Sequence, residues 1–397
     1  MRPAMQTLSP SPATAQEPKP LAPERRATTQ RLLLPERPSL LSRRAWLALV
    51  ALVIAVGCGA PIGALVLPES SAFHLSAYAL TIGGKFMCYA IAAIALDLVW
   101  GYCGILSLGH GLFFALGGYG IGMYLMRSIG HDGVYGSDLP DFMVFLNWHA
   151  LPWFWRGTEH LWYAIALVIV VPALLAWVFG FFAFRSRVQG VYLSIITQAL
   201  TYAAMLLFYR NETGFGGNNG FTDFKRIAGF PITHPDTRVA LFLMTFAALV
   251  LTFIGARAIV TSKLGRIVTA MRDSETRLMF LGYSPLAYKL FVWTLSAMLC
   301  AIAGALYVPQ VGIINPNEMS PANSIEMAIW VAVGGRGTLV GPIAGAFVVN
   351  AARSVFTAWL PEYWLFFLGA LFVVVPLLLP RGLAGLATAL MGRSGRK

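Results

Sequence analysis

Four charged side chains occur inside long apolar stretches of the sequence: Lys85, Asp97, Glu326 and Arg353. An ionised group in the hydrocarbon layer of a membrane is costly, so such residues are candidates for binding or moving a polar solute. Lys85 and Asp97 are separated by about 18 Å along one helix, at ~1.5 Å per residue, and cannot pair with each other. Each of them therefore needs a partner on another element or lies near the membrane surface.

Uncharged polar residues in the apolar stretches allow two interpretations. Thr197, Gln198 and Asn350 either form hydrogen bonds between helices or line a path for a polar solute. Glu326 also has a structural interpretation, because Asn323 can cap a helix that starts there and Glu326 then occupies the third helical position of a capping box. For each of these residues both interpretations stay open.

No motif for covalent, redox or nucleotide chemistry occurs in the sequence. It lacks G-x-S-x-G, H-E-x-x-H and the G-x-x-x-x-G-K-[ST] loop that binds nucleotide phosphates. The four cysteines show no C-x-x-C spacing, and the histidines form no cluster. We therefore predict that the chain is not an enzyme, that it binds no metal or cofactor, and that it does not hydrolyse ATP by itself.

The strongest break in the apolar pattern is a basic segment at about 258–288. Residues 263–282 carry apolar side chains at helical spacing and end at Gly282, which predicts an amphipathic helix along the membrane surface. That helix is either a connector between two spans or a docking site for a soluble partner. Basic residues outnumber the two acidic ones here: Arg257, Lys263, Arg266, Arg272, Arg277 and Lys289 against Asp273 and Glu275.

The composition predicts an all-α, polytopic integral membrane protein. Of the 397 residues, 57% are hydrophobic and 12% are charged, whereas a soluble domain carries about 25% charged residues. The span at 323–334 covers only roughly 18 Å, which indicates a half-helix or misplaced ends. Boundaries at Gly, Pro and charged residues give about ten transmembrane helices, some of them short or interrupted: 45–67, 76–99, 105–126, 161–184, 189–208, 239–257, 288–308, 323–334, 341–359 and 363–380.

The distribution of basic residues predicts the orientation of the chain. With the N-terminus inside, 21 of the 29 Lys and Arg lie on the inner side of the membrane and 6 on the outer side, in agreement with the positive-inside rule. Both termini are then cytoplasmic, and the net charge of +12 reflects topology rather than nucleic-acid binding. The predicted domains are a disordered, Pro-rich tail at 1–44, a transmembrane domain at 45–382 and a basic tail at 383–397.

Two glycine-rich features stand out among the loops. The stretch GFGGNNGFTDF at 214–224 predicts tight turns with positive φ, or a docking loop for a partner. It lacks the Lys-Ser/Thr of a phosphate-binding loop. The stretches 101–109 and 334–341 resemble each other, which is either an internal repeat of the kind found in transporters or a coincidence in a glycine-rich chain.

Six blocks of the sequence, in order, resemble the permease subunits of ABC importers of the branched-chain amino acid and urea type. The resemblance covers about residues 45–382. The blocks are SLGHGLFFALGGY (107–119), GVYLSIITQALTY (190–202), GFGGNNGFTDF (214–224), GRIVTAMRDSETRLMFLGYSPLAYKL (265–290), SAMLCAIAGALY (296–307) and VAVGGRGTLVGPIAGA (331–346).

This resemblance implies a multi-pass permease of the bacterial inner membrane. Such a permease pairs with a second, homologous permease subunit, receives solute from a periplasmic binding protein, and is driven by two cytosolic ATPase subunits that use ATP and Mg²⁺. A cytoplasmic helix of the family docks into the ATPase, and the resemblance places this docking at Arg272, Glu275, Arg277 and Gly282. Glu275 and Gly282 match the family's acid and glycine by position, whereas Thr276 and Arg277 replace its small residues.

Within the family, the sequence is most similar to the urea branch. The segment PDFMVFLNWHALPWFW at 140–155 and the form of the glycine stretch at 214–224 carry this similarity. Urea is small, neutral and polar, so its path needs hydrogen-bonding groups and aromatic walls. The candidates for that path are Phe113, Phe114, Thr197, Gln198 and Asn350.

Two alternatives to urea transport remain at this point. The same type of permease can carry branched-chain amino acids or another small polar solute, and an amino acid would need charged groups along its path. An integral-membrane enzyme or receptor is an alternative of another class, which the missing catalytic motifs disfavour.

Overall fold

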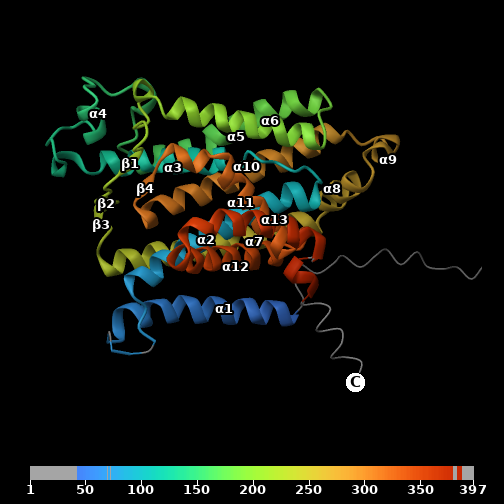
Figure 1. Cartoon of the computed structure of the whole chain (residues 1–397), viewed down its shortest axis with the longest axis horizontal. Coiled ribbons are helices and arrows are strands. Elements are labelled where there is room, and N and C mark those ends of the chain that lie inside the picture. The colour runs from blue at the N-terminus through green and yellow to red at the C-terminus, as the bar shows by residue number, and fades with distance from the viewer. Residues whose placement is uncertain (1–42, 69, 72, 379–381, 387–397) are drawn as a thin grey trace, which may run out of the picture. The chain divides into compact units, whose positions relative to one another are not determined.

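The computed structural model describes residues 43–68, 70–71, 73–378 and 382–386, and thirteen α-helices account for most of them (Figure 1). Three helices are short: α4 (Asp141–Phe145), α8 (Lys263–Asp273) and α9 (Glu275–Phe280). The others are α1 (Arg43–Pro61), α2 (Ala77–Asp97), α3 (His110–Arg127), α5 (Leu161–Arg185), α6 (Val191–Phe208), α7 (Pro235–Thr261), α10 (Pro285–Val311), α11 (Pro321–Gly334), α12 (Val340–Trp359) and α13 (Trp364–Leu378). Single π-helical turns extend α1 over Ile62–Val66 and α2 over Leu98–Tyr102.

Seven helices are long and apolar enough to cross a membrane, and they match seven of the ten predicted spans. They are Arg43–Val66, Ala77–Tyr102, Leu161–Arg185, Val191–Phe208, Pro235–Thr261, Pro285–Val311 and Val340–Trp359. The all-α, polytopic class is therefore confirmed. The other three predicted spans correspond to α3, α11 and α13, which are not among these seven. α11 starts two residues before the predicted span at 323–334, and with 14 residues it covers only roughly 21 Å, which fits the first of the two alternatives, a half-helix.

The centre of the bundle is formed by α2, α3 and α10, which contact one another and are flanked by α5 and α7. Between Met87 and Leu98, α2 is buried on all sides, as expected for a helix that is apolar all round. Two glycines let α3 and α10 approach closely. A Cβ on Gly117 would clash with the backbone of Ala301, and one on Gly304 would clash with the backbone of Phe114.

Four strands of two residues each lie in the described loops. β1 (Phe221–Thr222) pairs antiparallel with β4 (Ile313–Ile314), and β2 (Arg226–Ile227) pairs with β3 (Phe230–Pro231). The first pair joins the loop between α6 and α7 to the segment between α10 and α11. Gly220 permits this approach, because a Cβ there would clash with the backbone of β4.

The glycine stretch at 214–224 has the turn geometry that the sequence predicts. Gly214, Gly216, Gly217 and Gly220 all have positive φ, between 56° and 80°. Glycine adopts this conformation without steric penalty, whereas most other residues do not. The predicted turn chemistry is therefore confirmed for this loop.

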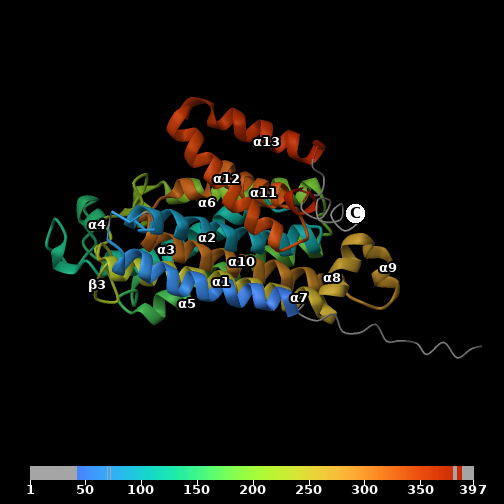
Figure 2. The same cartoon turned by 90° about the horizontal axis from the view of Figure 1, so that it is seen from below.

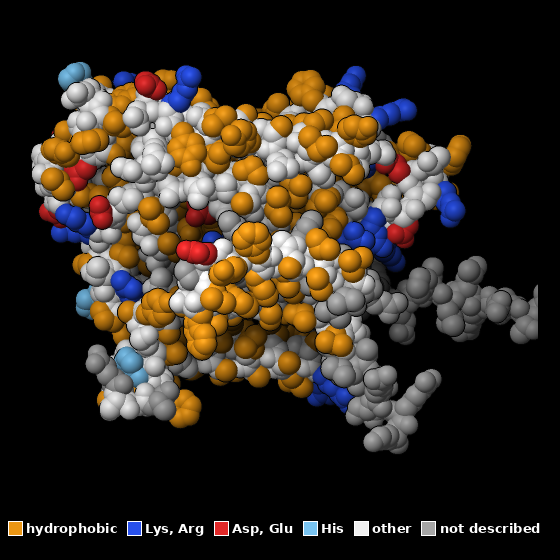
Figure 3. Space-filling view, in the orientation of Figure 1, with side chains coloured by type: hydrophobic (Ala, Val, Ile, Leu, Met, Phe, Trp, Pro, Cys, Tyr) orange, Lys and Arg blue, Asp and Glu red, His pale blue; other side chains and the backbone are white. Residues whose placement is uncertain are grey.

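The long helices run between two ends of the bundle (Figures 1 and 2). One end, which we call the α4 end, carries α4 and the short strands; the other, the α9 end, carries α8 and α9. In Figure 2, α1 lies along one edge, where it contacts α7, and α13 lies at the opposite edge. Charged side chains gather mainly at the two ends in Figure 3, and the face between them is largely apolar. This distribution is the one expected of a bundle whose middle faces hydrocarbon.

Most of the two predicted tails falls outside the described residues, namely 1–42 and 387–397. The end of the first tail is an exception. Arg43 and Arg44 belong to α1, so this helix starts two residues before the predicted span at 45–67.

Candidate functional site

A polar cavity of about 110 Å³ lies among α2, α10, α11 and α12. Its charged lining residues are Lys85, Glu318, Glu326 and Arg353, and its aromatic ones are Tyr89, Tyr307 and Trp330. We call it the charged cavity. Three of the four charged residues that the sequence places at membrane depth meet here, although they come from three different helices.

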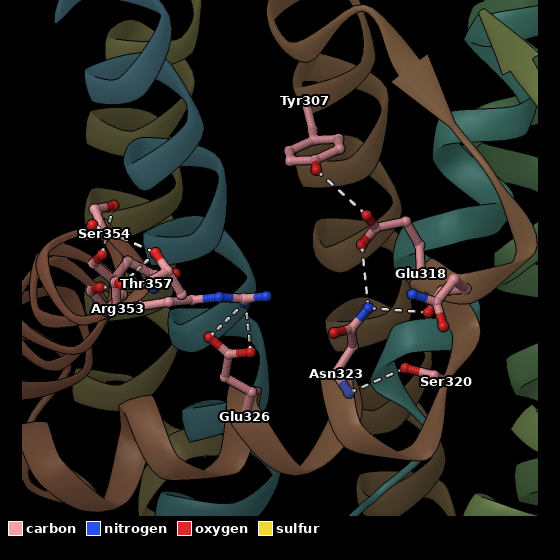
Figure 4. A network of polar contacts seen from close by, with 11 residues as sticks. Tyr307, Glu318, Ser320, Asn323, Glu326, Arg353, Ser354 and Thr357 are labelled. Atoms are coloured by element: carbon pink, nitrogen blue, oxygen red, sulfur yellow. Dashed lines mark hydrogen bonds and ion pairs between the residues drawn. The ribbon is translucent and has the colours of Figure 1, made fainter. Parts of the chain in front are cut away.

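Glu326 and Arg353 form an ion pair between α11 and α12 (Figure 4). Nη1 of Arg353 donates to both carboxylate oxygens of Glu326, at 3.0 Å and 2.7 Å. The Glu326 side chain is 4% exposed and that of Arg353 is 40% exposed. The carboxylate is thus buried with its charge compensated, while the guanidinium also reaches the outside of the cavity.

The capping-box prediction for Glu326 is wrong. α11 begins at Pro321, two residues before the expected cap at Asn323, and the side chain of Ser320 accepts the hydrogen bond from the backbone N of Asn323. Ser followed by Pro is a strong helix start, because the hydroxyl satisfies a free N–H and proline lacks one. Glu326 is therefore free to pair with Arg353.

Glu318 is the charged cavity residue that the sequence analysis missed. It lies in the short 3-10 turn Pro316–Met319 that precedes α11. The hydroxyl of Tyr307 donates to one carboxylate oxygen at 3.3 Å and Nδ2 of Asn323 donates to the other at 3.4 Å (Figure 4). Both bonds are long, and a carboxylate can accept about four, so Glu318 keeps acceptor capacity toward the cavity.

Lys85 reaches the cavity from α2, between aromatic rings. Its Nζ lies 5.7 Å from the ring centroid of Tyr89 and 5.9 Å from that of Tyr307, within the range of a cation–π interaction. Tyr89 in turn packs against Trp330, with 4.7 Å between the ring centroids. The four-residue spacing of Lys85 and Tyr89 places both on one face of α2.

Asp97 is separate from the cavity and ties α2 to the turn before α12. Its fully buried carboxylate accepts hydrogen bonds from the backbone N of Gly337, at 2.7 Å, and of Leu339, at 3.2 Å. Lys85 and Asp97 therefore have different partners, as their spacing predicts. The two similar glycine stretches also meet here, because a Cβ on Gly101 would lie 2.6 Å from the N of Gly337.

The two phenylalanines proposed for a solute path are both fully packed. Phe113 lies edge-on against His110 and Trp293, away from the cavity lining. Phe114 packs behind the cavity wall, with its ring centroid 6.1 Å from Tyr89 and 5.2 Å from Tyr307. Phe114 thus supports the aromatic wall, and neither ring lines the cavity.

The three polar candidates for the path lie elsewhere. Thr197 is buried, accepts from the backbone N of Leu108 at 3.1 Å and so joins α6 to the segment before α3, as the interhelical interpretation expects. Asn350 is also buried, and its Nδ2 donates within its own helix to the carbonyl of Ala346 at 2.8 Å. Gln198 is half-buried on α6. None of the three lines the charged cavity.

The basic segment at 258–288 folds as two helices and not as the single amphipathic helix that the sequence predicts. Ser274 adopts an extended conformation, with φ −162° and ψ 96°, and separates α8 from α9. Val268, Met271 and Leu278 are buried against the bundle. The expected apolar face is thus present up to the middle of α9.

The residues that the resemblance assigns to ATPase docking line this end of the bundle. Nη1 of Arg272 donates to the carbonyl of Gly101 at 2.7 Å, which fastens α8 to the π-helical turn of α2. Glu275 pairs with Lys289 at 2.6 Å. Arg277 is exposed, and Gly282 has a φ of +84° with open space around its Cα.

A cluster of exposed apolar side chains follows directly and forms what we call the α9 tip. Met279 is 48% exposed, Phe280 87%, Leu281 74% and Tyr283 42%. These residues lie at the charged α9 end and not in the apolar middle of the bundle. Contiguous exposed apolar residues in such a place are typical of a surface that another protein covers.

A second polar cavity, of about 380 Å³, lies beside α9 and is lined by Arg272, Glu275 and Lys289 among others. Cys103 also lines it, and burial raises the pKa of this thiol to about 12. The thiol is therefore protonated near neutral pH and is a poor nucleophile. Among the described residues, no group of three or more His, Cys, Asp or Glu is placed to hold a metal ion.

Comparison with known protein families identifies the chain. The model of the family described as "Branched-chain amino acid transport system / permease component" matches residues 78–376. The chain belongs to this family. The match runs from α2 to α13, and so includes the charged cavity, the α9 tip and every docking candidate. The protein is thus a membrane permease subunit of the ABC transporter type and not an enzyme.

Individual relatives agree with the family. The high-affinity branched-chain amino acid transport system permease protein LivM of Escherichia coli is 27% identical over 341 residues, which cover 80% of this chain and 73% of the relative. The LivM of Salmonella typhimurium is 26% identical with the same coverage. The permease protein LivH of Escherichia coli is 23% identical over 309 residues, covering 75% of this chain and 91% of LivH. No solved structure gave a significant match.

Proposed function

We propose that this chain is the membrane-spanning permease subunit of an ATP-driven importer that carries urea across a bacterial inner membrane. The observation that supports the choice of solute is the lining of the charged cavity, where aromatic walls stand beside hydrogen-bond donors and acceptors. Urea has one carbonyl acceptor and two amide donor groups on a flat frame of four heavy atoms. A site for such a molecule needs hydrogen-bond donors on one side, hydrogen-bond acceptors on the other, and aromatic rings against the flat faces of the molecule.

The size of the charged cavity supports a small solute. The cavity has a volume of about 110 Å³, well above the roughly 10–15 Å³ that one water molecule needs. A solute as small as urea therefore fits in it. The charges also balance, because two basic and two acidic residues line the walls.

In this proposal the α9 end and both termini face the cytoplasm. The positive-inside distribution of Lys and Arg supports that orientation. Two cytosolic ATPase subunits bind at the α9 tip and use ATP and Mg²⁺, while a second permease subunit and a periplasmic binding protein complete the importer. Relatives named as the permease proteins LivM and LivH, both similar to this chain, support a pair of related permeases.

Transport of branched-chain amino acids is the second candidate function. It is favoured by the printed names of the relatives and by the charged groups of the cavity, which can bind a zwitterion as well as an amide.

Uptake of labelled urea separates the two candidates. The importer, reconstituted with its binding protein and ATPase subunits, is expected to accumulate [¹⁴C]urea in an ATP-dependent manner, and a hundredfold excess of unlabelled leucine is expected not to compete. Uptake of [¹⁴C]leucine that excess urea leaves unchanged would assign the protein to amino acid transport instead.

A further inference from the structure

The four charged residues of the charged cavity are in two different states. Arg353 and Glu326 are joined by two hydrogen bonds, so each already has a partner of opposite charge. Lys85 faces the rings of Tyr89 and Tyr307, and Glu318 accepts only long hydrogen bonds from neutral groups. Within the described part of the chain, no ion pair with an N–O distance of 4.0 Å or less includes Lys85 or Glu318.

An ammonium and a carboxylate that line one cavity without touching are costly at membrane depth. α2 holds Lys85 on one wall of the cavity and the turn Pro316–Met319 holds Glu318 on another. A solute with a hydrogen-bond acceptor at one end and donors at the other would satisfy both charged groups at once.

We propose that Lys85 and Glu318 form the recognition site for the amide group of the transported solute. The Lys85 ammonium donates to the carbonyl oxygen of urea, and the Glu318 carboxylate accepts hydrogen bonds from its NH₂ groups. The rings of Tyr89 and Tyr307 wall the site. This assignment rests on the proposed function and names the part of the path that recognises the solute.

The Arg353–Glu326 pair has a different role in this arrangement. Because the pair is neutral and joins α11 to α12, it fixes the wall of the cavity and leaves Lys85 and Glu318 as the groups available to a solute. Arg353 and Glu326 are therefore positioning residues. Their loss is expected to weaken the assembly of the helices before it changes the recognition of urea.

The test uses the complete importer in proteoliposomes, with saturating binding protein, and measures the urea moved per ATP hydrolysed. Lys85→Met and Glu318→Gln keep the approximate shape of each side chain and remove its charge. Each variant is expected to lower the urea-to-ATP ratio about tenfold, which corresponds to about 1.4 kcal/mol. The ATPase rate itself should stay near that of the unmodified complex, whereas a folding defect would lower the urea flux and the ATPase rate together and leave their ratio unchanged.

Thr357→Ala is the matched control. Thr357 lies one turn after Arg353 on α12, is exposed, and donates to carbonyls of its own helix, so the urea-to-ATP ratio of this variant should not change. If the unmodified complex moves urea and both charge variants keep its ratio, the recognition site is wrong and the proposed function stands. If the unmodified complex moves no urea at all, the proposed function itself is wrong.

Discussion

In the charged cavity, four ionisable side chains lie inside the bundle among aromatic rings, whereas at the α9 tip four apolar side chains lie exposed among basic residues. Charged side chains usually face water and apolar side chains usually lie inside, and each of these two regions shows the opposite arrangement. Charges inside a membrane bundle raise its free energy unless they compensate one another or bind a solute. Apolar side chains on a polar surface raise it unless another protein covers them.

The difference supports a separate task for each region in the proposed importer. Among the described residues, two of the four charges in the cavity, Lys85 and Glu318, belong to no ion pair within 4.0 Å, which suits a polar solute that passes through. The α9 tip presents apolar side chains that are stable only when another protein buries them, which suits an interface with a permanent subunit. Substitutions in the two regions can test this difference when unfolding and transport are measured separately. The free energy of unfolding should change more for substitutions in the cavity than for those at the α9 tip.

The largest effect is expected when one member of the buried ion pair is removed. Arg353→Ala leaves the carboxylate of Glu326, which is 4% exposed, without a partner, and should lower the free energy of unfolding by about 3 kcal/mol. Glu326→Ala leaves a guanidinium that is 40% exposed and can reach water, so the loss should be about 1 kcal/mol. Thermal and denaturant unfolding in detergent micelles measure both values.

A double variant provides the control for this pair. Replacing Glu326 by Leu and Arg353 by Met together should recover most of the stability that Arg353→Ala loses, because no buried charge is left without a partner. A greater loss for Glu326→Ala than for Arg353→Ala would contradict the burial argument.

The next effect concerns Asp97, which lies on α2 between the two regions. Asp97→Ala deprives the backbone N–H groups of Gly337 and Leu339 of their acceptor, and should cost about 2 kcal/mol of stability. Asp97→Asn keeps one acceptor oxygen and should lose about half as much. Equal losses in the two variants would mean that the charge, and not the hydrogen bonding, holds the turn.

A smaller effect on stability is expected at Gly282, next to the α9 tip. Its φ of +84° is strained for any other residue, so Gly282→Ala should cost about 1 kcal/mol. Gly282→Arg adds bulk and charge in the open space beside the tip, and should uncouple ATP hydrolysis from urea uptake while the complex still assembles. Normal uptake by the arginine variant would speak against docking at this point.

The smallest effect on stability belongs to the α9 tip itself. Phe280→Asp should change the free energy of unfolding by less than about 0.5 kcal/mol, because the ring is 87% exposed, and should abolish co-purification of the ATPase subunits. Phe73→Asp is the matched control, since that ring is 81% exposed in the connection between α1 and α2. If both variants retained the ATPase subunits, the tip would not be the docking surface.

The sequence predicts much of the bundle, because apolar length and spacing are properties of one helix at a time. Seven spans and the half-helix α11 follow from that information. Lys85, Glu326 and Arg353 can also be picked out as candidates, since a charge in an apolar run is visible without any knowledge of its neighbours. Their meeting in one cavity depends on how α2, α11 and α12 cross, which spacing along a single helix does not encode.

Glu318 shows why the rest of the site was missed. Its segment is polar and not helical, so it resembles an external loop, although it lines a cavity within the bundle. The short length of α11 is the available signal, because a half-helix requires non-helical chain at membrane depth to complete the crossing. Conversely, Thr197 and Asn350 look available in the sequence but bond to backbone groups in the fold.

The pairing of β1 with β4 has a mechanical consequence for the recognition site. Three residues lie between the end of β4, at Ile314, and Glu318, and the four residue steps that join them reach about 13 Å at most even when extended. The loop between α6 and α7 is therefore connected to Glu318 by a short segment, so the two cannot move far apart. In the proposed importer, a protein that binds this loop at the α4 end would therefore act on the wall that carries Glu318.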